Sequence, residues 1–235
     1  IEDLQLDFHK YKIFKHNNID DYIENNYELI KTAKNWEERQ SIFEIIEAYS
    51  SIAAEERWGN SDYPSYKKAL EISVDLGEEF LKTGDFSYWQ YPENAQKVLM
   101  FEMRSNLASL SELILNPSPK VRQKTIDFCK DLVDFIYLNK DKDFVYDSDE
   151  LRRIYQTISD QNHWLEKYEE RQKYMLKSLS LVRSDTIAFS EEIKSVHLRD
   201  ISLYYGEYLE NDSLALIYYE EYIQTNDFLP DSLDY

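Results

Sequence analysis

Glycine and proline are scarce in this sequence: four glycines and five prolines occur in 235 residues. These residues supply most of the tight turns between short strands, so their scarcity favours long helices joined by few loops. Apolar residues also recur at helical spacing, as in the stripe formed by Ile42, Ile45, Ile46 and Tyr49. No alternating pattern typical of a strand extends beyond a few residues. The sequence therefore predicts an all-α protein.

The apolar periodicity and its interruptions divide the chain into about ten helices, which we expect to form antiparallel hairpins. Two helix starts carry clear signals, because Ser118 precedes Pro119 and Asp147 stands three residues before Glu150 as a capping pair. The break around Pro117 separates an N-terminal helical half, 1–116, from a C-terminal half, 117–235, within one continuous domain. The predicted helices span about 4–14, 20–33, 35–58, 62–84, 94–115, 119–139, 151–159, 164–181, 190–209 and 213–225.

Similar residue patterns recur at a nearly constant spacing in the second helices of three predicted hairpins. Helix pairs that recur every 40 or so residues stack as an α-solenoid in tetratricopeptide and HEAT proteins. An irregular bundle of similar helices would give the same spacing, and Arg171 stands where a tetratricopeptide repeat would have a small residue, so both architectures remain open. The matching positions, at offsets of 43 and 44 residues, are Phe128/Leu132/Phe135, Arg171/Met175/Ser178 and Ala215/Tyr219/Tyr222.

The net charge of −19 restricts the partners of the chain. A protein that binds nucleic acid or an anionic membrane surface needs lysine and arginine against the phosphates, so both partners are disfavoured. No run of about 18 apolar residues exists to span a membrane, and no signal-peptide pattern follows Ile1. The single Cys129 excludes an internal disulfide and agrees with a reducing cytoplasm. We therefore expect a cytoplasmic protein with a cationic partner.

The sequence offers little for catalysis. It has no glycine-rich phosphate loop, no nucleophile elbow and no paired histidines at metal-ligand spacing. His163 follows Asp160 on one helical face, but a metal site there would need further ligands. Cys129 is expected to be a small buried hydrophobe. We therefore predict a non-enzymatic protein with no catalytic residue, no metal and no cofactor.

The last 36 residues, 200–235, combine nine carboxylates with seven tyrosines and contain no lysine, arginine or histidine. Helical spacing predicts that Leu198, Ile201, Tyr205 and Tyr208 point inward from one helix, and Leu214, Ile217 and Tyr218 from the next. One interpretation is a binding surface for a basic partner, and the alternative is a solvated acidic face that only maintains solubility. The predicted partner-binding residues are Tyr205, Glu207, Tyr208, Glu210, Asp212, Glu220 and Glu221.

Parts of this sequence carry a family resemblance. Tyr204-Tyr205-Gly206-Glu207-Tyr208 is followed by Ala215-Leu216 and later by Leu229-Pro230-Asp231-Ser232-Leu233, while Ile46-Glu47-Ala48-Tyr49-Ser50 lies in the N-terminal half. These segments resemble the PoNi-type immunity proteins of bacterial polymorphic toxin systems. In this chain Glu207 replaces an aromatic residue and the alanine cluster of that family is reduced to Ala215. The resemblance implies an all-α protein that binds and neutralises a secreted toxin, typically a nuclease with a basic cleft.

Three functions therefore remain open. The first is a non-catalytic immunity protein that blocks a basic toxin through an acidic, tyrosine-rich helical surface. The second is a helical-repeat domain that binds a peptide, as in a sensor, a scaffold or a regulator whose DNA-binding part lies outside this sequence. The third is an all-α enzyme with magnesium at Asp20, Asp21 and Glu24, a spacing that is similar to the acidic motif of prenyl-transfer enzymes.

Overall fold

The computed structural model describes residues 70–71, 74–75, 77–82, 86–87, 90–113, 119–185 and 187–226. These residues form helices and contain no strand, which confirms the predicted all-α class for this part of the chain. The predicted helices at 4–14, 20–33 and 35–58 lie outside the described residues, so the total of about ten stays a prediction. The chain divides into two compact units, Ile1–Val121 and Arg122–Tyr235. The prediction of one continuous domain also remains a prediction.

In the first unit, helix α6 spans Pro92–Leu113 and begins at a proline, which suits the first helical position. Its buried stripe consists of Leu99, Met103, Leu107 and Leu110. Val98 is exposed, because it lies one position away from this stripe. Gly77 lies against Met103, where an added Cβ would overlap the Met103 sulfur.

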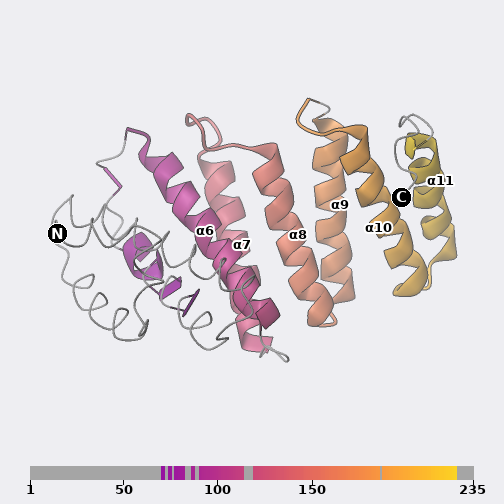
Figure 1. The fold of residues 1–235 in the computed structure, drawn as a ribbon, viewed down its shortest axis with the longest axis horizontal. Coiled ribbons are helices and arrows are strands. Elements are labelled where there is room, and N and C mark those ends of the chain that lie inside the picture. The colour runs from indigo at the N-terminus through magenta and orange to yellow at the C-terminus, as the bar shows by residue number, and fades with distance from the viewer. Residues whose placement is uncertain are drawn as a thin grey trace, which may run out of the picture. The chain divides into compact units, whose positions relative to one another are not determined.

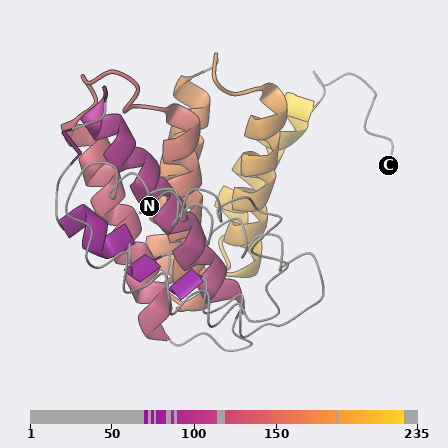
Figure 2. The same cartoon turned by 60° about the vertical axis from the view of Figure 1, so that its left-hand side comes forward.

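The second unit contains the remaining described helices. Their bounds are α7 Pro119–Leu138, α8 Ser148–Trp164, α9 Tyr168–Ser184, α10 Glu191–Glu207 and α11 Asp212–Asn226, with α7 entering the unit at Arg122. Helices that follow one another in the chain pack together, α8 on α9, α9 on α10 and α10 on α11 (Figure 1). The view in Figure 2 also places α11 beside α10. Short connections between these partners make the pairs antiparallel hairpins.

Side-chain caps fix where three of these helices begin. The carboxylate of Asp147 accepts a hydrogen bond from the Glu150 backbone N–H at 2.9 Å, which confirms the predicted capping pair. Ser190 caps α10 in the same way. The amide oxygen of Asn211 accepts from the Leu214 N–H at 3.1 Å and starts α11. Each cap pairs a backbone N–H that has no partner within its own helix.

Helix α8 continues beyond its predicted end at residue 159 as far as Trp164. The polar run after Ser159 looks like a loop in the sequence, but Gln161 and Asn162 are buried in the helix. Gln161 Oε1 accepts a hydrogen bond from Arg122 Nη1 at 3.0 Å, and Asn162 Nδ2 donates to the Ile158 carbonyl at 2.8 Å. Because their polar groups are paired, these side chains are compatible with a helix interior. The prediction of a connection here was wrong.

The turns after α8 and α10 each use a glutamate in the left-handed region, where glycine is the usual residue. Glu166 has φ 57°, and Lys167 N–H donates to the Asn162 carbonyl at 2.9 Å across the turn. Glu210 has φ 49°, and Asn211 N–H donates to the Tyr205 carbonyl at 2.9 Å. The second turn positions α11 against α10.

Candidate functional site

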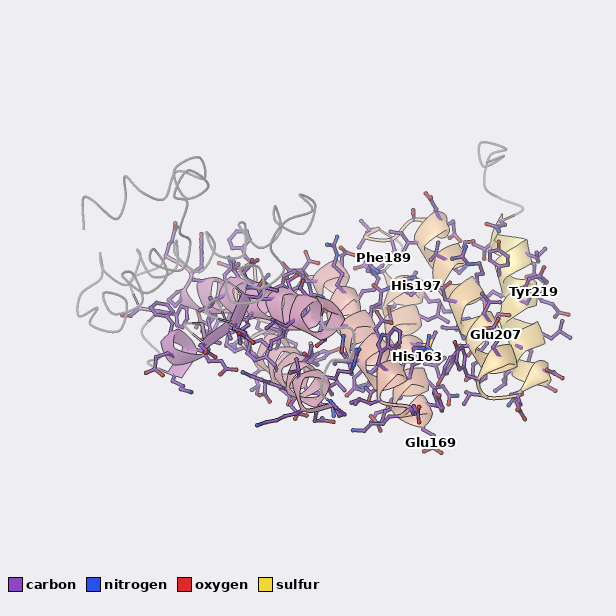
Figure 3. All side chains as sticks on the ribbon, turned by 60° about the horizontal axis from the view of Figure 1, so that its bottom comes forward. His163, Glu169, Phe189, His197, Glu207 and Tyr219 are labelled. Carbon is purple, nitrogen blue, oxygen red and sulfur yellow. The ribbon has the colours of Figure 1, made fainter. Side chains whose placement is uncertain are left out.

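Four of the predicted contact residues form an exposed set of carboxylates, which we call the acidic surface: Glu207, Glu210, Asp212 and Glu220. Glu207 ends α10, Glu210 lies in the turn, and Asp212 begins α11 (Figure 3 labels Glu207). Among the described residues none of the four forms an ion pair. The surface therefore carries uncompensated negative charge.

Tyr205 lies in the interior of the second unit. Its side chain is 3% exposed and belongs to a core cluster with Leu179, Leu198 and Ile201. The ring stacks on Tyr218 of α11 with 5.5 Å between centroids and an interplanar angle of 8°. This position gives Tyr205 a packing function between α10 and α11, and its ring does not face solvent.

Glu221 differs from the acidic surface because it has a cationic partner. It is half-buried and forms an ion pair with Arg183 of α9. The Arg183 guanidinium also lies 5.9 Å from the centre of the Tyr218 ring. The pair therefore neutralises Glu221 and ties α11 to α9.

Apolar side chains lie exposed along α11. Ile217 was predicted to point inward, but it is 56% exposed, and the same helix also exposes Leu216, Tyr219 and Ile223. Figure 3 labels Tyr219 on this helix. Apolar residues occupy four successive positions from Leu214 to Ile217, so the helical period alone cannot identify the buried face. Tyr208, also predicted to point inward, is exposed where α10 ends.

A pocket of about 370 Å³ opens between α8, α9 and α10. Apolar side chains, among them Met175 and Ile201, line it together with the tyrosines Tyr204 and Tyr208. Its polar lining consists of Gln156, Ser159, Asp160, Arg171, Ser178, His197, Asp200 and Glu207. The pocket therefore adjoins the acidic surface at Glu207 but adds a cation, Arg171.

Arg171 is held against aromatic rings rather than against a carboxylate. Its guanidinium carbon lies 4.2 Å from the centre of the Tyr204 ring and 5.4 Å from that of Tyr208. Its Nη1 is in hydrogen-bond contact with His163 Nδ1, and its Nε is buried without an acceptor. Across the described residues no carboxylate forms an ion pair with it.

The tyrosine rings around Arg171 are themselves fixed. Tyr204 and Tyr208 stack at 5.5 Å, and the Tyr204 hydroxyl donates to the Tyr168 carbonyl at 2.8 Å. The His163 ring meets Tyr208 edge-on at 5.1 Å. Burial, and next the neighbouring Arg171 charge, lower the pKa of His163, so its Nδ1 is free to accept from the guanidinium.

His197 is a buried histidine whose two nitrogens are both paired. Nδ1–H donates to the Ile193 carbonyl at 2.8 Å, so Nε2 accepts from the Ser178 hydroxyl at 3.0 Å and from Gln156 Nε2 at 3.3 Å. Burial lowers the pKa of His197 and keeps the ring neutral. Figure 3 shows His197 on α10. Its geometry joins α8, α9 and α10 beside the pocket.

The described residues contain no group of three or more histidine, cysteine or acidic side chains placed to hold a metal ion. The Asp160–His163 pair lacks a further ligand, and His163 Nδ1 is engaged by Arg171. Asp20, Asp21 and Glu24 lie outside the described residues, as do 46–50 and 229–233. Cys129 is fully buried, as predicted. In the part of the chain that was searched, no helix is both long and apolar enough to cross a membrane.

No model of a known protein family matches this chain, and no curated protein matches it significantly. The sequence had not identified the pocket as a site. The one signal for it was Arg171, a large cation at a repeat position where a small residue would be expected.

Proposed function

We propose that this chain is a non-catalytic binding protein that holds a basic protein partner on its acidic surface. The observation that carries the proposal is the group of exposed, unpaired carboxylates, with Glu207, Glu210 and Asp212 where α10 meets α11 and Glu220 further along α11. A structural helix pair needs no such group, because like charges on one surface repel one another.

The exposed apolar residues of α11 support the same function. Leu216, Ile217 and Tyr219 lie exposed on the helix that carries Asp212 and Glu220. Protein interfaces commonly combine an apolar or aromatic centre with a polar rim, and complementary charge increases the rate of association. In this proposal α11 provides the centre and the acidic surface the charge, while Tyr205 and Glu221 hold the helices together.

The particular class we propose is a cytoplasmic immunity protein that neutralises a bacterial toxin. The resemblance of residues 204–208 and 215–216 to PoNi-type immunity proteins supports this class. A nuclease toxin binds phosphates through a basic cleft, and an acidic surface would occupy such a cleft by imitating their charge.

A peptide-binding helical-repeat domain is the second candidate function. It is favoured by the pocket between α8, α9 and α10, which lies within the size range of small-ligand sites. The packing of each helix on its neighbour in the chain, from α8 to α11, is also what a short α-solenoid requires.

Charge reversal tests the first function. The variant E207K/E210K/D212K/E220K is co-expressed with a bacterial toxin that the unchanged protein neutralises, and bacterial growth is measured. The matched control, D131K/D134K/D141K/D143K, makes the same change in net charge at exposed acids of α7 and the connection after it. We expect the first variant to lose protection and the control to keep it. If both variants fold correctly and protect equally well, the acidic surface is excluded as the toxin-binding site.

A further inference from the structure

Arg171 differs from the neighbouring cations that form ion pairs. Arg152 and Arg153 pair with Asp149, Lys173 with Glu170, Lys194 with Glu191, and Arg199 with Asp200. Arg171 instead lies on the faces of Tyr204 and Tyr208 and lines the pocket. Lys177 of the same helix also forms no ion pair within the described chain, but it is exposed, whereas Arg171 is half-buried.

The surroundings hold the Arg171 guanidinium in place but leave its charge uncompensated. A carboxylate stabilises a cation more strongly than aromatic faces and a neutral histidine do. The buried Nε–H has no acceptor among the described residues, and such groups in native structures need an explanation. A carboxylate in the pocket would supply the anionic partner that the guanidinium lacks.

We propose that Arg171 anchors the carboxylate of a short peptide ligand in the pocket between α8, α9 and α10. A guanidinium forms strong, charge-assisted hydrogen bonds with a carboxylate, and the stacked tyrosines orient its plane. The proposal goes beyond the binding of a basic partner, and it deepens the second candidate function by naming the group that the pocket recognises.

The remaining lining restricts the ligand further. Asp160, Asp200 and Glu207 also line the pocket, so a doubly charged phosphate would meet three carboxylates. A ligand with one carboxylate and a positive group avoids this repulsion, because the positive group faces the acids. Of these acids Glu207 has no cationic partner within the described chain, whereas Asp200 pairs with Arg199. These features favour a peptide with a lysine beside its free carboxylate.

Nuclear magnetic resonance of the arginine Nε–H groups provides the test with the intact chain. The probes are lysyl-leucine with a free carboxylate, the same dipeptide as its C-terminal amide, and inorganic phosphate. We expect lysyl-leucine to shift the Arg171 Nε–H signal saturably, with the amide and phosphate at least tenfold weaker. The amide carries more positive charge than the acid, so general attraction to this acidic protein would produce the opposite order.

A fourth probe, glutamyl-lysine amide, has only a side-chain carboxylate and shows whether the pocket takes a chain end or an acidic side chain. R171Q should abolish the saturable response of the other pocket signals, while R153Q, an exposed arginine outside the pocket lining, should retain it. Equal responses to acid and amide, tighter binding of phosphate, or no saturable shift with either carboxylate would overturn the proposal. Asp212 and Glu220 do not line the pocket, so D212K/E220K should still bind lysyl-leucine. A failure of the acidic surface to bind a basic partner can therefore be told apart from a failure of the pocket to bind the peptide.

Discussion

Tyr205 of α10 and Tyr218 of α11 stack almost in parallel, with 5.5 Å between ring centroids and 8° between planes. The Tyr205 hydroxyl also accepts a hydrogen bond from Gln172 Nε2 of α9. The pair therefore connects three helices of the second unit and positions α11. Because α11 carries the exposed apolar residues and part of the acidic surface, the geometry of the candidate site depends on these two rings.

Replacing Tyr205 by alanine should destabilise the second unit by about 3–5 kcal/mol, because it removes a large buried ring and leaves a cavity. Y205F should cost only about 1 kcal/mol, the value of the hydrogen bond from Gln172. Urea unfolding followed by circular dichroism measures both. Y219A is the control, since Tyr219 is 49% exposed, and it should change stability by about 0.5 kcal/mol or less.

The left-handed turn at Glu210 allows a stabilising substitution. A residue with a Cβ is strained at φ 49°, and glycine is not, so E210G should raise the free energy of unfolding by about 1 kcal/mol. E220G removes the same side chain in the middle of α11 and should lower stability by about 1 kcal/mol. Thermal unfolding of both proteins checks the prediction. If E210G melted below the unchanged protein, the turn would not be strained.

The helices of the second unit were predictable where local signals act. Asp147 and Ser118-Pro119 carry start signals that depend on neighbouring residues alone, and α8 and α7 begin there. The end of α8 was not predictable, because Gln161 is compatible with a helix only through Arg122, 39 residues earlier in the chain. Pairing over such distances leaves no local pattern.

The candidate site was predictable only in part, for the same reason. The acids Glu207, Glu210, Asp212 and Glu220 are exposed as expected, since unpaired carboxylates avoid the interior. Tyr205 is buried and Tyr208 is exposed because α10 ends between them, at Glu207. Which face of α11 is buried depends on its packing against α10. The contact of Arg171 with Tyr204 joins residues 33 positions apart and requires the packing of α9 on α10.

Acid should destabilise the second unit through His197. Burial lowers the pKa of His197 in the folded state, so below its unfolded pKa of about 6.5 the unfolded chain binds a proton that the folded chain does not. Stability should therefore fall as the pH decreases from 7.5 to 5.5, by at most about 1.4 kcal/mol per pH unit from this group. Urea unfolding at several pH values measures the slope.

H197Q provides the comparison for this pH dependence. Glutamine retains hydrogen-bonding groups near Ser178 and Gln156 but does not titrate, so the slope between pH 7.5 and 5.5 should decrease. The pKa of His163 is also lowered, and this residue should account for part of the slope that remains. An unchanged slope in H197Q would show that His197 is not the group that titrates.

Glu220 and Glu221 are adjacent in sequence but should affect different properties. Glu220 is exposed and unpaired, whereas Glu221 is half-buried and paired with Arg183. E220Q should therefore slow association with a basic partner and leave stability within about 0.5 kcal/mol. E221Q should lower stability by up to about 1 kcal/mol, since the ion pair is partly exposed. Stopped-flow association rates and urea unfolding separate the two effects.

Salt provides the control for the electrostatic part of this difference. At about 1 M ionic strength the Debye length falls to roughly 3 Å, which screens the attraction between exposed charges. At this salt concentration the unchanged protein and E220Q should both associate more slowly than at low salt, and their association rates should no longer differ. A difference that persists at high salt would mean that Glu220 makes a local contact with the partner, and that the long-range charge of the acidic surface is not what accelerates binding.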